Sequence, residues 1–484
     1  MTKGFKFFRL FKGQNSLRID YFITSINGLM VLMGVFVLNG LIARKYGLEV
    51  LGEFLLIKRT TLSLMGILLL GMNIGVPSML GRWNTRSVEG SAFLLFTIFT
   101  IPIIAAMMLL VHLGLAPGFV HSNSSAYGIY MAGIAFQAMI YGIYRGHLKM
   151  MGANSIQLLG TAIMPIIVFS YIGIPKVSLT IIGFGMILIS GISYLLLKPD
   201  KSVWVNNTAY IKKLTHFGGE RIISFISQFI LLAGAPILVS FSNPYSDLAF
   251  FNSLISIVRT FLFVIGPLGI VLLPRIARLV ETNGTEKIGQ GLAQLLELIV
   301  IVSCVLSIFL SSMGGDLLNY WLGSITDTGS WMASVILLTI PFYLVAEILR
   351  SPIDALSDKG YNSIIYFFAA ISLVVTFFAG VYFQVPVLKA GVYGFFLGYL
   401  ISALGSLMVI RKLTNFPMPS FKSYLRLIVF SGGSYAVVRG AEAMNVAVAG
   451  EVLLKIAFMV VLISIFMFQS RDQVKSLNSF SKIL

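Results

Sequence analysis

The sequence is poor in charge, cysteine and histidine. Only 11% of its 484 residues are charged, whereas soluble proteins carry roughly 25%. The single cysteine, Cys304, leaves no disulfide framework and no thiolate metal site. The four histidines are scattered, with no carboxylate or cysteine at ligand spacing. The sequence therefore predicts no metal site.

Signatures of catalysis are also missing. The chain has no Gly-Lys dipeptide, which excludes a P-loop, and neither an H-E-x-x-H nor a D-x-D pattern. No long polar segment between the apolar runs can fold into a catalytic domain. We therefore expect a protein that is not an enzyme and that uses no cofactor.

What the sequence has in abundance is apolar runs of about 20 residues, the length that crosses a hydrocarbon core about 30 Å thick. Such runs, with 57% hydrophobic residues overall, predict an all-α polytopic membrane protein with about fourteen transmembrane helices. The expected spans are 20–42, 54–76, 91–113, 126–146, 153–174, 177–197, 221–241, 249–273, 289–312, 331–350, 361–383, 388–410, 424–441 and 450–469.

Basic residues fall on alternate loops between these runs. Most of the 35 Lys and Arg residues lie at the two termini and in every second loop. By the positive-inside rule, both termini are cytoplasmic. The formal charge of +17 then faces anionic lipid headgroups rather than nucleic acid. The loops predicted to lie outside hold only Arg44, Lys45, Lys176, Lys389 and Arg439.

Short sequence matches indicate an internal repeat. Arg18-Ile19 and Phe22-Ile23 recur as Arg221-Ile222 and Phe225-Ile226, and Arg59-Thr60 recurs as Arg259-Thr260. Because both pairs begin spans of matching direction, they predict a parallel repeat of six spans. The expected organisation is two six-helix bundles, 1–200 and 201–413, around a central cavity, followed by two additional helices and a cytoplasmic tail in 414–484.

Arg259 is the basic residue that lies deepest in a predicted span. It is ten residues into the eighth span, about 15 Å deep. A guanidinium facing lipid there costs at least roughly 2.5–3.5 kcal/mol, so we expect Arg259 to face a hydrated cavity. The alternative is a structural ion pair with a carboxylate on a neighbouring span.

Polar residues at helical spacing accompany this arginine. Such a stripe on an apolar helix is typical of a cavity-lining face. Asp20 and Glu220 start two of these spans near the cytoplasmic face and are candidates for ion coupling, or are solvated there. The predicted lining residues are Thr24, Asn27, Lys58, Arg59, Ser224, Gln228, Asn252, Ser256 and Arg259. For Lys58 and Arg59, extension to the outer membrane surface is an equal alternative.

Three segments resemble a known family. YGLEVLGEFLLIKRTTLSLMGILLLGMNIGVPSMLGR (46–82), YRGHLKMMGANSIQLLG (144–160) and FFNSLISIVRTFLFVIGPLGIVLLPRIARLVE (250–281) are similar to the corresponding parts of Wzx-type polysaccharide flippases. These belong to the multidrug/oligosaccharidyl-lipid/polysaccharide exporter (MOP) superfamily. The span count and the short loops agree with the family along essentially the whole chain.

The resemblance implies a function. Wzx proteins translocate undecaprenyl-pyrophosphate-linked oligosaccharides across the bacterial inner membrane by alternating access, for surface polysaccharides such as the O-antigen of lipopolysaccharide. Cavity-lining basic residues are implicated in the family, and the matching positions here are Arg59 and Arg259, with Lys58 adjacent. Membrane lipids, a polysaccharide polymerase and a chain-length regulator are the expected partners.

Two rival functions stay open on the sequence alone. A multidrug or cation antiporter of the same superfamily needs a carboxylate deep in its cavity, whereas the deep charge here is Arg259. A membrane scaffold that partners a polysaccharide polymerase would use the polar stripes only for packing.

Overall fold

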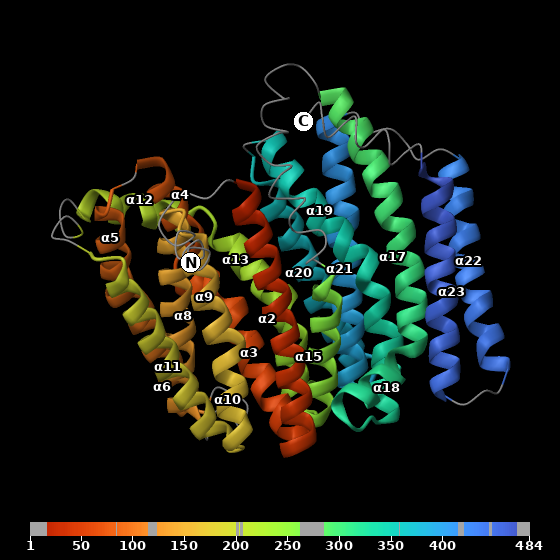
Figure 1. The fold of residues 1–484 in the computed structure, drawn as a ribbon, viewed down its shortest axis with the longest axis horizontal. Helices are drawn as coiled ribbons and strands as arrows, with labels where there is room; N and C mark the ends of the chain where they lie inside the picture. The colour runs from red at the N-terminus through yellow and green to blue at the C-terminus, as the bar shows by residue number, and fades with distance from the viewer. Residues whose placement is uncertain are drawn as a thin grey trace, which may run out of the picture. The chain divides into compact units, whose positions relative to one another are not determined.

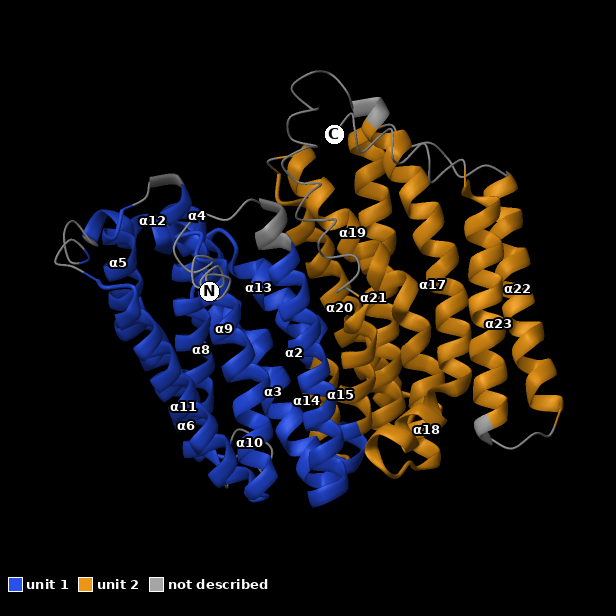
Figure 2. Cartoon of the chain, viewed as in Figure 1, with its two compact units in different colours: residues 1–233, 244–249 blue, residues 234–243, 250–484 orange. Residues whose placement is uncertain are grey.

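The computed structural model describes residues 17–83, 85–114, 123–199, 203, 207–261, 285–357, 359–414, 421–444 and 448–471. These residues form helices and connecting turns, and they divide into two compact units. Unit 1 is 1–233 with 244–249, and unit 2 is 234–243 with 250–484 (Figure 2). The division falls within the seventh and eighth expected spans. Outside the described part lie the predicted cytoplasmic ends at 1–16 and 472–484, the second half of the eighth expected span (262–273), and the side chain of Asp20.

Unit 1 is a bundle of long helices, coloured red to yellow-green in Figure 1. Its first six expected spans are all present as helices. They are α2 (Leu17–Tyr46), α3 (Leu48–Leu68) with α4 (Met72–Trp83), α5 (Ser87–Leu95) with η1 (Phe96–Thr100) and α6 (Ile101–His112), α8 (Ser124–Gly146), α9 (Met150–Leu158) with η2 (Leu159–Ile163) and α10 (Met164–Tyr171), and α11 (Pro175–Leu196). The unit also contains α12 (Asn207–Gly219) and α13 (Ile222–Phe229).

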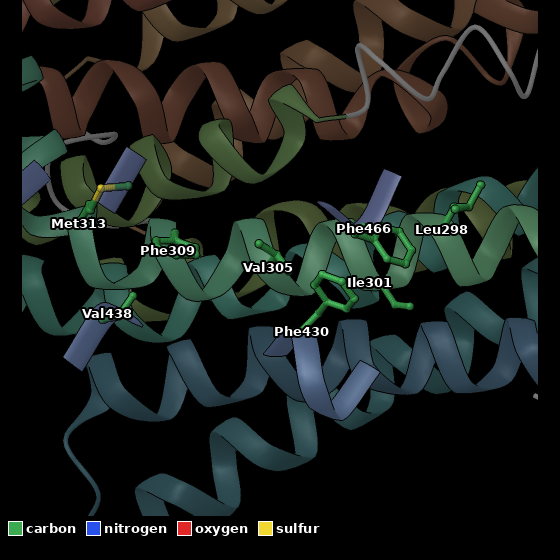
Figure 3. Packing of buried hydrophobic residues seen from close by; sticks show 8 residues of the cluster. All are labelled: Leu298, Ile301, Val305, Phe309, Met313, Phe430, Val438 and Phe466. Atoms are coloured by element: carbon green, nitrogen blue, oxygen red, sulfur yellow. The ribbon is translucent and has the colours of Figure 1, made fainter. Parts of the chain in front are cut away.

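Unit 2 is built around one long helix, α17 (Thr285–Leu322). The other helices of this unit are α14 (Ala235–Ser240), which continues α13 through η4 (Ile230–Gly234), most of α15 (Tyr245–Thr260), α18 (Asp327–Ile336) with η5 (Leu337–Thr339) and α19 (Ile340–Leu356), α20 (Tyr361–Tyr382), α21 (Val387–Thr414), α22 (Phe421–Ala443) and α23 (Val448–Gln469). Helices α22 and α23 pack on α17 through a shared apolar core (Figure 3). That core is Leu298, Ile301, Val305, Phe309, Met313, Phe430, Val438 and Phe466.

The helices confirm a multi-pass membrane protein. In the described part, eleven helical stretches are long and apolar enough to cross a membrane, and the bent pair Leu48–Leu68 and Met72–Gly81 brings the number to twelve. The two other expected spans correspond to α15, which reaches the limit of the described residues, and to α22, a continuous but less apolar helix. The all-α polytopic fold predicted from the sequence is therefore correct.

Prolines determine where the spans of both units depart from regular α-helix. Each of the turns η1, η2, η4 and η5 ends two residues before a proline. Proline has no backbone N–H, and its ring displaces the carbonyl one turn earlier, so the helix locally widens to a π-turn or tightens to a 3₁₀-turn. The four prolines are Pro102, Pro165, Pro236 and Pro341.

The second span bends by 51° between α3 and α4. At the bend, Gly71 has φ +69°, which is unstrained only for glycine. A Cβ at Gly218 would lie 2.0 Å from the carbonyl oxygen of Leu70, so α12 approaches the bend without room for a side chain. Two glycines thus allow α12 to pack against the break.

Helices α8 and α11 of unit 1 cross at facing glycines. A Cβ on Gly133 would lie 2.4 Å from the carbonyl oxygen of Gly183, and a Cβ on Gly183 would lie 2.6 Å from that of Ile129. Close approach of small residues is how membrane helices associate where lipid provides no hydrophobic driving force.

Gly183→Leu should therefore separate α8 from α11 and destabilise the protein by about 3 kcal/mol, the upper end of the usual cost of overpacking. Gly191→Leu is the matched control, because a Cβ at Gly191 on the same helix meets no atom within 4 Å. The measurement is the midpoint of thermal unfolding of the purified protein. Equal midpoints for the two variants would contradict the close crossing.

Candidate functional site

In unit 2, Arg259 lies at the end of the described part of α15 and its side chain is exposed. The Tyr343 hydroxyl and, one turn further along α19, the carboxylate of Glu347 are close enough to act electrostatically on the Arg259 guanidinium. Glu347 also lies 3.9 Å from Nη1 of Arg350. Arg259 thus lies beside a hydroxyl and shares an acid with a second arginine, and the residue as a whole is exposed.

Packed aromatic rings hold the Tyr343 side chain, whose hydroxyl lies near Arg259. The Tyr343 ring is edge-on to Tyr399, with centroids 5.1 Å apart, and Tyr399 is edge-on to Phe395 at 4.9 Å. Phe395 in turn packs on Phe251 of α15 at 6.1 Å. This row of rings joins α15, α21 and α19 and restricts the Tyr343 side chain.

The rest of the predicted stripe on α15 is less open than Arg259. Asn252 is completely buried, and its carbonyl oxygen accepts a hydrogen bond from the Ser256 hydroxyl at 2.8 Å. The Thr260 hydroxyl donates to the Ser256 carbonyl at 2.9 Å. The two hydroxyls therefore bond to their own helix, and Arg259 is the member of the stripe whose side chain is exposed.

In unit 1, Lys58 lines a cavity within the unit. The cavity has a volume of about 160 Å³. It lies between α3, α8, α11 and the span formed by α9, η2 and α10. Its polar lining residues are Lys58, Tyr130, Gln137, Tyr141, Gln157 and Thr161. Lys58 is 9% exposed, and its ammonium nitrogen has no hydrogen-bond partner in the described part.

Arg59, the neighbour of Lys58, is 7% exposed and is absent from the cavity lining. Consecutive helical residues point about 100° apart. The buried positions of Lys58 and Arg59 do not match the alternative in which both extend to the outer membrane surface.

Thr24 and Asn27 of α2 contact the fifth span of the same unit. The Asn27 amide donates to Oε1 of Gln157 at 3.2 Å, and the Asn154 amide donates to the Thr24 hydroxyl at 3.2 Å. Because Gln157 lines the Lys58 cavity, Asn27 supports that cavity from behind. A role for either residue in contacting a substrate stays a prediction.

The stripe on α13 of unit 1 begins at a solvated end. Glu220 lies 3.2 Å from His216 and 3.9 Å from Arg221, and its side chain is 58% exposed. Further along, the Gln228 amide donates to the Ser224 hydroxyl at 3.0 Å. Exposure of Glu220 agrees with the solvated alternative for this acid, and ion coupling through it stays a prediction.

Sequence reasoning missed a buried polar cluster at one end of unit 1. Glu89, near the start of the third span, is 1% exposed; its Oε1 lies 2.6 Å from Nε2 of His147, and its Oε2 accepts from the Tyr194 hydroxyl at 3.0 Å. The Tyr144 hydroxyl bonds the Ser193 carbonyl at 2.6 Å beside it. An acid two residues into an apolar helix was the one available signal, and nothing in the sequence named its partners.

Comparison with solved structures shows which class of membrane protein shares this fold, namely transporters of the MOP superfamily. The chain is similar to the lipid II flippase MurJ in an inward closed conformation (TM-score 0.65, 15% identity, covering 94% of this chain and 100% of that one). It is also similar to an inward-facing multidrug resistance MATE family transporter of the MOP superfamily (0.63, 16%, 83% and 96%).

A third similar structure is described by the polarity of its own binding pocket. It is a MOP superfamily transporter from Pyrococcus furiosus whose binding pocket has reverse polarity, suggesting a different function (TM-score 0.56, 16% identity, 87% of this chain and 98% of that one). No protein-family model and no curated protein matches the sequence. At these identities the structures establish that the chain has the MOP transporter fold.

Proposed function

We propose that this protein is a flippase that moves undecaprenyl-pyrophosphate-linked oligosaccharides across the bacterial inner membrane by alternating access, for surface polysaccharide assembly. The observation that carries the proposal is Arg259, an exposed residue within an expected membrane span, whose guanidinium lies near the Tyr343 hydroxyl. The likeness of the fold to a lipid II flippase supports a lipid-linked substrate.

The chemistry of the passenger explains the need for such a residue. A pyrophosphate and several sugars cannot cross hydrocarbon unaided, since each unpaired polar group costs several kcal/mol. A guanidinium offers two parallel N–H donors to phosphate oxygens, a geometry that an ammonium lacks. Arg259 would bind the pyrophosphate, while the lipid tail stays in the bilayer.

The direct test is reconstitution of the purified chain into liposomes with undecaprenyl-pyrophosphate-linked oligosaccharide labelled on the sugar. A membrane-impermeant glycosidase added outside then reports how much substrate has reached the outer leaflet. We expect the protein to expose the inner-leaflet pool to the enzyme. The same exposure in protein-free liposomes and in liposomes with protein would reject the proposal.

A cation antiporter is the second candidate, and the likeness to MATE transporters favours it. Glu347 is the acid it would use, but this carboxylate lies beside Arg259 and Arg350, whose charges disfavour an organic cation. Binding of a cationic dye in place of lipid-linked sugar would favour the antiporter. We also propose a polysaccharide polymerase and a chain-length regulator as partners. A passive scaffold role is the remaining alternative, and the Arg259→Gln variant tests it.

A further inference from the structure

We propose that the cavity inside unit 1 binds a small monovalent inorganic anion at the Lys58 ammonium, for which chloride is the probe. This site lies within one unit and is separate from the pyrophosphate contact assigned to Arg259. It does not depend on the flippase function.

The first argument is the state of Lys58 itself. A buried ammonium without a partner is costly, because water and counter-ions are removed from it. Lys58 is 9% exposed and its Nζ has no hydrogen-bond partner in the described part, although it lies 5.5 Å from the centroid of the Phe54 ring. A cation–π contact of this length replaces only part of the lost solvation. The ammonium is therefore a donor without an acceptor, on a side chain that lines the cavity.

The second argument is the charge of the cavity. Among the described residues, Lys58 is the one basic residue that lines it, and no acid of the described part does. A monovalent anion would neutralise the site, whereas a divalent anion would leave a net negative charge buried in low dielectric. The charge of the lining thus favours a small monovalent anion over pyrophosphate, and the buried charge of the neighbouring Arg59 adds to the attraction for an anion.

The third argument is the set of donors around the ammonium. The Oε1 atom of Gln157 accepts from Asn27 at 3.2 Å, which leaves the Nε2 amide as its donor toward the cavity that it lines. Thr161, in the π-turn η2, and Tyr130 add hydroxyls to the lining. Gln137 contributes less, because its amide already donates to the Ile156 carbonyl at 2.7 Å.

The space is sufficient for such an anion with some of its water. The cavity volume of about 160 Å³ is roughly ten times the 10–15 Å³ that one water molecule needs by the same measure. Apart from the six polar residues named above, the lining is apolar. An anion held there would keep bound water on the side away from Lys58.

The test is equilibrium binding of radiolabelled chloride to the purified full chain in detergent, without lipid-linked sugar. We expect one saturable site, at least tenfold weaker in Lys58→Met and unchanged in Lys176→Met, which removes an exposed lysine from α11 of the same unit. Gln157→Leu keeps the ammonium and should weaken binding severalfold, so the test survives if Lys58→Met fails to fold.

Three results would overturn the proposal: no saturable chloride binding by the parent chain, equal binding by Lys58→Met, or displacement of chloride by phosphatidylglycerol at lower concentration. The last would assign the cavity to a lipid phosphodiester. Loss of sugar flipping with chloride binding intact would reject only the proposed function, so the two failures are distinguishable.

Discussion

Arg259→Gln should reduce translocation of lipid-linked oligosaccharide about 30- to 100-fold at unchanged protein level. The variant removes a charge-assisted contact to phosphate, worth about 2–3 kcal/mol. Glutamine keeps a donor for the Tyr343 hydroxyl, so the packing around α15 and α19 is preserved. The measurement is the rate at which substrate becomes accessible to glycosidase in liposomes, alongside surface polysaccharide in cells that carry the variant.

Two further variants separate charge from shape at this position. Arg259→Lys retains the charge but loses the bidentate geometry, so it should fall between the parent chain and Arg259→Gln. Arg439→Gln is the control, because Arg439 is an arginine of the same unit whose side chain is 65% exposed and lies 3.2 Å from Glu442. Normal export by Arg259→Gln at a normal protein level would favour the scaffold function.

His147→Ala should destabilise the protein by about 3 kcal/mol. The Glu89 carboxylate is 1% exposed in the parent chain, and without the imidazole it retains only the Tyr194 hydroxyl of its two described partners. Removing one partner of a buried pair costs more than the pair itself contributes, because the remaining group keeps its desolvation penalty. The measurement is the thermal unfolding midpoint of the purified chain.

The structure supplies a matched control for this prediction. His216 forms a second histidine–glutamate pair in the same unit, 3.2 Å from Glu220, but the side chains are 76% and 58% exposed. His216→Ala should change stability by no more than about 0.5 kcal/mol. Adding Glu89→Gln to His147→Ala should restore part of the loss. A double variant as unstable as the single one would show that the buried carboxylate is not the cause.

The positions of the spans could be predicted because each leaves a strong local signal. Runs of apolar residues and alternating basic loops placed the ends of helices such as α8 and α20 within a few residues of where they are observed. The expected span 424–441 is less apolar than its neighbours, and the structure nevertheless has a continuous helix there, α22.

Which face of each helix packs, and which lines a cavity, could be predicted only in part. A polar stripe has the same spacing whether it packs against a helix or lines a cavity, so the sequence grouped Asn27 and Asn252 with Arg259. In the structure, Asn27 hydrogen-bonds Gln157, and Asn252 is fully buried. Contacts between distant segments leave no periodic signal at all. The pairing of Glu89 with His147 depends on how two spans meet, and a single sequence does not encode that locally.

The π-turns that precede prolines change the angular positions of the side chains around these membrane helices. A π-turn accommodates one extra residue in a helix, so every side chain after it is rotated by about 100° relative to an uninterrupted count. In the fifth span the insertion falls at Leu159–Ile163, between Gln157 and Pro165, and yet both line the same cavity. A cysteine scan along this span should therefore show a labelling pattern that slips by one position midway, and a helical wheel drawn straight through it would assign the second half to the wrong neighbours.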